Sequence, residues 1–427
     1  MDWKSTGSPY SILINNQLVT KAFNVAEEIN KFFHQKIADI RKSINEQGWT
    51  PDACEKVRES KKCKLFLNHI SKPEVLKIIR GLSNSKCTSI DGLNNFGIKI
   101  AADVILDPLH HIITLSLMQE KFPSQWKKAK VIPLHKTGDT LMAKNYRPVS
   151  ILSPLSKVLE KVVCSQVYHY FTINKILHPS LHGYRKNRST LTSLLEMYHK
   201  WVEAASHGQV SGAVMLDLSA AFDLVSTDIL LKKLRIYGLQ RDFLDWMKDY
   251  MSDRQQSVWI DHKYSNLLPC EAGVPQGSIL GPLIFLIFVN DLPSTLTSNM
   301  DQYADDSTIS LTSQDSQETS VILTRDCEKV SSWMNENRLK INPDKTHILT
   351  LGTDHKLKKP ENEIAVSMDG LDLEKSSNSA EKLLGCYFQA NLKWTKQIDN
   401  VKSKLAKRIA GLSTLKKPLP NNIMKII

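Results

Sequence analysis

Tyr303-Ala304-Asp305-Asp306 is the stretch of this sequence that decides the fold: two adjacent carboxylates follow an aromatic and a small residue. The flanking residues, with Met300 before and Ile309 after, suit a β-hairpin whose tip carries the aspartates. Side chains alternate between the two faces of a strand, so one aspartate can face a site while the other lies at the turn. Aspartate is also a common turn residue, and an ordinary polar turn is therefore the alternative interpretation.

A second carboxylate follows a predicted buried strand at residues 209–218. This strand is apolar from Val214 to Leu216, and Asp217 comes directly after it. Two carboxylates brought together from separate strands repel each other by a few kcal/mol at ~4 Å and an effective dielectric constant near 20. Two divalent ions held about 3.5–4 Å apart relieve that repulsion and can activate a hydroxyl group for phosphoryl transfer. All-oxygen ligands favour Mg²⁺, so we expect two magnesium ions, with Mn²⁺ as a substitute.

The order of several motifs then resembles a known family. Asp217 with Phe222, the block Gly273-Val274-Pro275-Gln276-Gly277-Ser278-Ile279-Leu280-Gly281-Pro282, and Tyr303 to Asp306 stand in the order and spacing of reverse transcriptase motifs A, B and C. Further matching blocks are Val131-Ile132-Pro133 with Lys136 to Asp139, Asn145 to Ser150, His182 to Thr190, and Leu339 to Thr346. The closer similarity is to the non-LTR (LINE-type) retrotransposon enzymes, over residues 70–415.

The resemblance implies an α+β fold of the right-hand polymerase type. Its fingers and palm, with an antiparallel palm sheet flanked by helices, are expected at 121–395. A mainly helical N-terminal extension is expected at 1–120, and a partial helical thumb, cut short, at 396–427. We expect a reverse transcriptase core without an upstream endonuclease.

The resemblance also implies roles for individual residues. Asp217, Asp305, Asp306 and the backbone carbonyl of Leu218 would hold the metals, with Asp305 the principal ligand of the pair and Asp306 an auxiliary. Lys345 would be the general acid for the pyrophosphate leaving group, and a surface lysine is its alternative. Residues implied to bind the dNTP are Lys136 and Arg147 on the triphosphate, Phe222 against a 2′-hydroxyl, and Gln276 as a buttress.

The charge distribution predicts a nucleic-acid partner. The net charge is +12, and basic residues gather in clusters that include residues 61–64, 127–130, 185–188 and 402–408. Separate basic clusters suit an extended polyanion, although each one alone is as well explained by a solvated helix face. Residues expected to contact nucleic acid are Arg185, Arg188, Tyr303, Lys402, Lys404, Lys407 and Arg408.

The cysteines and the apolar runs limit the cellular setting. The chain has seven cysteines without a CxxC pair, which argues against zinc knuckles and a disulfide framework and favours a reducing compartment. The longest apolar run, 279–289, is too short to span a bilayer and predicts a buried helix. We expect an intracellular protein, nuclear or cytoplasmic, that is neither secreted nor bound to a membrane.

Hydrophobic periodicity predicts the remaining elements. Helices are expected at 23–40, within 72–120, at 227–237 and 241–254, from 277 onward, at 314–338 and at 396–415. A strand is expected at 126–135, a hairpin over 256–272, and one strand at 382–388.

The expected function is RNA-directed DNA synthesis, in which a DNA primer on an RNA template is extended with dNTPs. Two alternatives stay open. One is a catalytically inactive nucleic-acid-binding remnant of such an element, which departures from the family pattern such as Gln389 would suit. The other is an RNA-directed RNA polymerase, which Phe222 disfavours because a bulky ring there excludes the 2′-hydroxyl. The sequence leaves the oligomeric state open.

Overall fold

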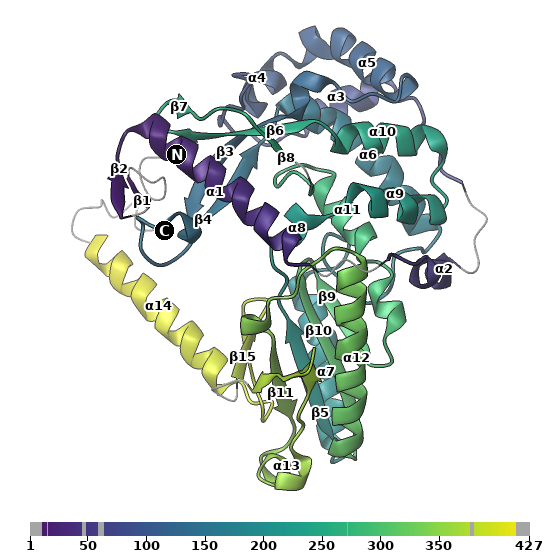
Figure 1. The fold of residues 1–427 in the computed structure, drawn as a ribbon, viewed down its shortest axis with the longest axis vertical. Helices are drawn as coiled ribbons and strands as arrows, with labels where there is room; N and C mark the ends of the chain where they lie inside the picture. Colours follow the sequence, from purple (N-terminus) through teal and green to yellow (C-terminus); the bar gives the residue numbers. More distant parts are fainter. Residues whose placement is uncertain are drawn as a thin grey trace. The chain divides into compact units, whose positions relative to one another are not determined.

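The computed structural model describes residues 11–14, 16–44, 48–58, 64–270, 272–375 and 380–415. Residues 61–63 of the first basic cluster and 416–427 of the predicted thumb lie outside them. The chain forms two compact units, whose elements Figure 1 labels. The first unit contains residues 1–184, 218–295 and 330–341, and the second contains 185–217, 296–329 and 342–427.

A five-stranded sheet organises the second unit. Its strand order is β14 (Glu374–Lys375), β11 (His347–Leu351), β5 (Val210–Leu216), β10 (Asp306–Ser313) and β9 (Asn299–Tyr303). The β9–β10 hairpin confirms the turn predicted at Tyr303 to Asp306. Neighbouring strands are antiparallel except that β14 runs parallel to β11, so the sheet is mixed where an antiparallel one was predicted.

The central strand β5 is buried on both faces, which explains its apolar run from Ala213 to Leu216. On one face Ala213 and Met215 belong to a core cluster with Met197 and Trp201 of α7 (Thr190–Ser206). On the other face Gly212 leaves room for Leu323 of α12 (Ser316–Glu336), because a Cβ on Gly212 would lie 2.6 Å from the leucine Cδ1. Helices therefore cover both faces of this strand.

The C-terminal part of the second unit corrects one prediction. The single strand predicted at 382–388 is a hairpin of β15 (Ala380–Leu383) and β16 (Cys386–Gln389), turned by Leu384 at φ 46° and Gly385 at φ 91°. Gln389 accepts hydrogen bonds from the Thr395 hydroxyl (2.7 Å) and the Lys396 amide (2.8 Å) at the start of α14 (Thr395–Leu415). This departure from the family pattern therefore has a structural role as a helix cap.

Short elements complete the second unit: α13 (Asp354–Leu357), β12 (Ser367–Met368) and β13 (Leu371–Asp372).

The first unit contains a second sheet, covered by the N-terminal helix. The strand order is β4 (Tyr146–Ile151), β3 (Lys128–His135), β6 (Arg254–Ile260) and β7 (Lys263–Tyr264), and β8 (Leu268–Cys270) also pairs with β6. Helix α1 (Ala22–Lys42) confirms the helix predicted at 23–40. Its buried Ile29 and Phe33 share a core cluster with Val131 and Val258 of the sheet.

The other elements of the first unit are β1 (Ile12–Ile14), β2 (Gln17–Val19), α2 (Asp52–Arg58), α3 (Lys72–Arg80), α4 (Asn95–Ile100), α5 (Ala102–Met118), α6 (Pro154–Ile173), α8 (Ala221–Leu224), α9 (Thr227–Ile236), α10 (Arg241–Met251) and α11 (Gly281–Phe288). They include the predicted helices within 72–120 and at 227–237, and also β1, β2, α2, α6 and α8, which the hydrophobic pattern did not predict. The predicted helix 241–254 ends at Met251 because Ser252 is extended and Asp253 has φ 54°, so Arg254 begins β6. The helix predicted from Gly277 begins at Gly281 because Gly277 has φ 99°.

Among the described residues, no helix combines the length and the apolar character needed to cross a membrane. The cysteines within the described residues (Cys54, Cys87, Cys164, Cys270, Cys327 and Cys386) are free thiols.

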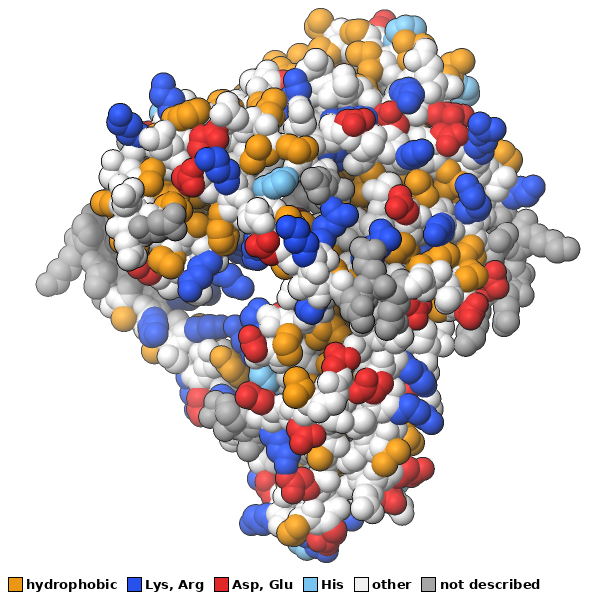
Figure 2. All heavy atoms as spheres, viewed as in Figure 1, with side chains coloured by type: hydrophobic (Ala, Val, Ile, Leu, Met, Phe, Trp, Pro, Cys, Tyr) orange, Lys and Arg blue, Asp and Glu red, His pale blue; other side chains and the backbone are white. Residues whose placement is uncertain are grey.

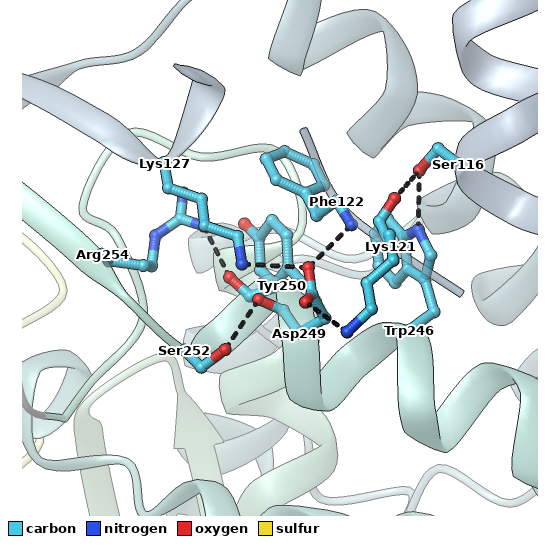
Figure 3. A network of polar contacts seen from close by, with 9 residues as sticks. All are labelled: Ser116, Lys121, Phe122, Lys127, Trp246, Asp249, Tyr250, Ser252 and Arg254. Atoms are coloured by element: carbon cyan, nitrogen blue, oxygen red, sulfur yellow. Dashed lines mark hydrogen bonds and ion pairs between the residues drawn. The ribbon is translucent and has the colours of Figure 1, made fainter. Parts of the chain in front are cut away.

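A polar network fixes the chain as it enters β3 (Figure 3). The carboxylate of Asp249 on α10 accepts from the backbone N–H of Phe122 (2.8 Å) and pairs with Lys127 (2.9 Å) and Lys121 (3.2 Å). Burial alone would raise the pKa of Asp249, but the hydrogen bonds from Lys127, Phe122 and Lys121 outweigh it and lower the pKa. The network therefore stabilises the fold with an ionised Asp249.

We expect Asp249→Asn to lower the free energy of unfolding by about 1–3 kcal/mol at pH 7, since it leaves the buried Lys127 ammonium without its counter-charge. Because the folded-state pKa of Asp249 is depressed, this difference is fully present above the ordinary aspartate pKa of about 4 and shrinks as the pH falls below it. Urea unfolding at several pH values measures the effect. Asp245→Asn, in an exposed pair on the same helix, is the control and should change stability by less than about 0.5 kcal/mol.

Candidate active site

Strand pairing brings the predicted metal-binding carboxylates together in the second unit. Leu216 of β5 pairs with Ser307 of β10 in antiparallel register, so one further step places Asp217 opposite Asp306. Residues opposite each other in an antiparallel pair project from the same face. Asp305 lies between β9 and β10 at the hairpin tip, after Ala304 at φ 60°. Three carboxylates therefore gather where β5 ends and β10 begins.

The electrostatics of this cluster show uncompensated repulsion. Asp306 keeps contact with solvent, yet partial desolvation, then the charge of Asp305 and then that of Asp217 raise the pKa of its carboxyl. The Lys345 ammonium lies 3.1 Å from the Asp217 carboxylate and supplies part of the missing positive charge. A cluster of this kind, with oxygen donors only, matches the preference of a hard divalent cation.

Asn342 is a site residue that the sequence prediction did not single out. Its side-chain Nδ2 donates to the Asp217 carboxylate (3.2 Å), and its backbone N–H donates to the Asp217 carbonyl (2.8 Å). Its position inside the matching block Leu339 to Thr346 was the available signal. Asn342 thus holds both the main chain and the side chain of Asp217.

The predicted triphosphate residues lie on the β3–β4 hairpin of the first unit. Leu134 pairs with Arg147, and the Lys136 N–H donates to the Asn145 carbonyl (2.8 Å). Lys136 therefore follows the end of β3 and Arg147 lies near the start of β4, so the two basic residues are close together in the hairpin. Both are exposed to solvent and can reach an anion.

Phe222 has a defined orientation in the first unit. Its ring stacks on Phe285 of α11, with centroids 4.5 Å apart and an interplanar angle of 26°. Tyr184 packs edge-on against it at 6.3 Å. A half-buried ring held on two sides is rigid enough to act as a steric barrier.

Gln276 contacts a carboxylate that the sequence prediction overlooked. Its Nε2 lies 2.9 Å from each carboxylate oxygen of Asp223. The loop that carries Gln276 also packs closely: a Cβ on Gly277 would lie 2.4 Å from the Ser150 carbonyl oxygen. Asp223 could have been noted only as the residue after Phe222.

A predominantly cationic pocket lies beside Gln276 in the first unit. Figure 2 shows Lys and Arg side chains over the C-terminal half of α1, which forms one wall of the pocket. Residues that line the pocket include Lys36, Arg41, Arg254, Asp223, Gln276 and Ser150. Arg254 is buried, and its Nη2 has no hydrogen-bond partner among the described residues.

The basic cluster at 127–130 is largely structural. Lys127 is buried in its ion pair with Asp249, and the buried Lys130 ammonium lies 4.0 Å from the Trp259 ring centroid. Burial lowers the pKa of Lys130. The prediction that this cluster faces nucleic acid is therefore wrong for these two lysines.

The other predicted nucleic-acid residues retain at least partial exposure. Arg185 and Arg188 precede α7 and are half-buried, and Tyr303 is half-buried at the end of β9. Lys402, Lys404, Lys407 and Arg408 are all exposed on α14. Basic side chains on an exposed helix are suited to backbone phosphates.

The family model for reverse transcriptase (RNA-dependent DNA polymerase) matches residues 132–397, well over half of the chain. The chain belongs to the reverse transcriptase family. This match confirms the resemblance drawn from the ordered motifs and implies a polymerase-type palm and fingers. Members of this family generally use divalent metal ions.

Similar proteins come from mobile elements, as the resemblance to non-LTR reverse transcriptases predicts. A probable RNA-directed DNA polymerase from transposon BS of Drosophila melanogaster is 30% identical over 64% of this chain and 31% of its own length. The RNA-directed DNA polymerase from mobile element jockey of the same species is 27% identical over 83% of this chain and 39% of its own. A Pol polyprotein from the type-1 retrotransposable element R2 of Popillia japonica is 24% identical over 44% and 26%. This reverse transcriptase chain thus spans about a third of the length of these relatives.

Gly277→Ala should lower the free energy of unfolding for two reasons: alanine is strained at positive φ, and its Cβ would collide with the Ser150 carbonyl oxygen. We expect the collision to add about 1–3 kcal/mol to the loss that is due to positive φ. Gly370→Ala is the matched control: Gly370 also has positive φ (75°), but a Cβ there would meet nothing within 4 Å. Urea unfolding of both variants measures the difference. Equal losses of stability would show that the loop can move away from β4.

Proposed function

We propose that this chain is an RNA-directed DNA polymerase of a non-LTR retrotransposon, with fingers, palm and thumb regions. The primer 3′-hydroxyl attacks the α-phosphate of a dNTP; a P–O bond forms, pyrophosphate leaves, and the hydroxyl proton is released. The observation that carries the proposal is that Asp217, Asp305 and Asp306 lie close together where β5 ends and β10 begins. The segments 1–120, 121–395 and 396–427 would be the extension, the fingers with the palm, and the thumb.

The carboxylate cluster fits divalent metal ions. Partial burial, and then the charges of Asp305 and Asp217, raise the pKa of Asp306, and a bound cation would offset the part that is due to these charges. Asp217, Asp305, Asp306 and the Leu218 carbonyl would hold two Mg²⁺, which when bound would polarise the attacking hydroxyl and neutralise phosphate charge. Lys345, already beside Asp217, would give a proton to the pyrophosphate leaving group.

The first unit would supply the nucleotide-binding residues. Lys136 and Arg147 lie at the same end of the β3–β4 hairpin and would bind the triphosphate, Arg147 through its planar fork. Phe222, held by Phe285 and Tyr184, would exclude a ribose 2′-hydroxyl. Gln276 would buttress the bound nucleotide.

The RNA template and DNA primer would be held without sequence readout. Arg185, Arg188 and the basic face of α14 would contact phosphates, and Tyr303 would support the primer end. The free thiols support a reducing, intracellular compartment. A nucleic-acid-binding remnant without catalysis is the second candidate, favoured by the exposed basic α14.

Asp305→Ala should reduce magnesium-dependent dNTP incorporation on an RNA template by more than about 1,000-fold, because a metal ligand is lost. Its magnesium-independent binding to an RNA–DNA hybrid should stay within about twofold of the wild type. A primer-extension assay and a binding titration measure the two quantities. If the wild type binds the RNA–DNA hybrid but does not extend the primer, the result would favour the inactive nucleic-acid-binding remnant.

Phe222→Ala should raise the incorporation of ribonucleotides relative to deoxyribonucleotides by about 10-fold or more, because the ring that would meet the 2′-hydroxyl is removed. Steady-state extension with dNTP and NTP in parallel gives the ratio. Phe285→Leu is the comparison variant, since it should loosen the support of Phe222 and shift the ratio less. Unchanged discrimination in Phe222→Ala would contradict the assignment.

Replacing both Lys407 and Arg408 by Ala should reduce the dependence of log Kd on log salt by about 1–2, because each phosphate contact contributes about 0.7–0.9 to the slope. Binding to an RNA–DNA hybrid at several salt concentrations measures it. Lys263→Ala, exposed on β7, is the control and should leave the slope unchanged.

A further inference from the structure

The contact between Asp223 and Gln276 fixes the orientation of an amide. The Gln276 Nε2 donates to both carboxylate oxygens of Asp223, each at 2.9 Å. An ionised carboxylate can only accept hydrogen bonds, so the amide nitrogen must face Asp223 and the amide oxygen must point elsewhere. The Asp223 carboxylate therefore leaves the Gln276 Oε1 as the amide atom that can contact another group.

The backbone around this contact is already held independently. The N–H of Val274 donates to the Phe222 carbonyl (2.8 Å), and the N–H of Gly273 donates to the Val225 carbonyl (3.1 Å). A Cβ on Gly273 would lie 2.5 Å from the Asp223 Cα, so the two segments touch. Removing the Asp223 carboxylate thus releases the Gln276 side chain while these main-chain contacts remain.

Asp223 is mainly ionised at neutral pH, although its burial opposes the charge. It is the sole carboxylate among the described residues that line the cationic pocket, with Lys36 and Arg254 also in the wall. Desolvation raises the pKa of Asp223 to about 6, against the lowering effects of the Gln276 hydrogen bond and the Lys36 charge. At pH 7 and above the carboxylate is mainly ionised and acts as an acceptor.

We propose that Asp223 is a positioning residue that holds the Gln276 amide with its oxygen presented as a hydrogen-bond acceptor to the incoming nucleotide. The proposal rests on the nucleotide-binding function proposed for Gln276. Because the contact lies in the free protein, its effect falls on nucleotide binding more than on the chemical step. An asparagine at this position can donate as well as accept, so it would no longer impose one amide orientation.

The first test is steady-state dNTP incorporation at pH 7.5 on an RNA template with a DNA primer. Asp223→Asn should raise KM for the dNTP by about 3- to 10-fold, the effect of one hydrogen bond, with kcat within about twofold of the wild type. Asp228→Asn, an exposed carboxylate on α9, is the matched control and should leave both constants unchanged. An unchanged KM in Asp223→Asn overturns the proposal.

A double-mutant cycle separates action through Gln276 from a general structural effect. In a Gln276→Ala background, Asp223→Asn should change KM by less than about twofold, because the group that it positions is absent. The same increase in both backgrounds would show that Asp223 acts independently and would overturn the proposal.

A charge change supplies a variant that does not depend on Asp223→Asn alone. Gln276→Glu should raise KM strongly because two carboxylates then face each other, and adding Asp223→Asn should recover part of the loss because its amide can donate to the glutamate. Failure of the second change to recover any affinity contradicts the proposed contact. Thermal melting of each variant checks that the fold is retained.

A binding measurement separates this proposal from the proposed function. Fluorescent dNTP is titrated into the protein with primer and template in Ca²⁺, whose coordination is looser than that of Mg²⁺. The extension assay tests the polymerase and the titration tests the positioning role. If the wild type does not extend the primer but binds dNTP more tightly than Asp223→Asn does, the positioning role stands and the polymerase function is refuted. If the wild type extends the primer and Asp223→Asn binds dNTP as tightly as the wild type does, the polymerase function stands and the positioning role is refuted. No dNTP binding by the wild type would refute both.

Discussion

Mutual repulsion among Asp217, Asp305 and Asp306 is the constraint on which the second unit depends. Like charges in one cluster must be held by forces that do not come from the cluster itself. Here the β5–β10 hydrogen-bond ladder and the burial of β5 on both faces supply those forces. The edge that carries the three carboxylates is thus stabilised by the apolar sheet behind it.

Lys345 and Asn342 offset the repulsion on one side. Both lie against the Asp217 carboxylate, at 3.1 and 3.2 Å. The lysine is 56% exposed, so its ion pair contributes little stability and the ammonium can move. The Lys345 ammonium is therefore held beside Asp217 less firmly than a buried cation would be. Asn342 is fixed by its main-chain hydrogen bond to Asp217 and cannot move as freely.

In the first unit, close packing around glycine sets the position of the Gln276 loop. Gly273 and Gly277 both have positive φ and lie where a Cβ would meet backbone atoms. The loop therefore rests on main-chain contacts, and the side chain of Gln276 is left to be oriented by Asp223. The cationic groups nearby divide in the same way: Lys127 and Lys130 are used for packing, whereas Lys136 and Arg147 stay exposed.

The amino-acid sequence alone was enough to predict the hairpin at Tyr303 to Asp306, the strand before Asp217, the helices at 23–40, 314–338 and 396–415, and the family, because local periodicity and ordered motifs carry that information. It did not predict α6 or α7. Tertiary packing was needed to place Asp306 opposite Asp217, Asn342 beside Asp217 and Asp223 against Gln276, and to bury Lys127 and Lys130. Each of these depends on the register of strands or on a contact between segments far apart in the chain. Side-chain pairing across such distances leaves no period in the sequence, since it arises only when separate elements pack together.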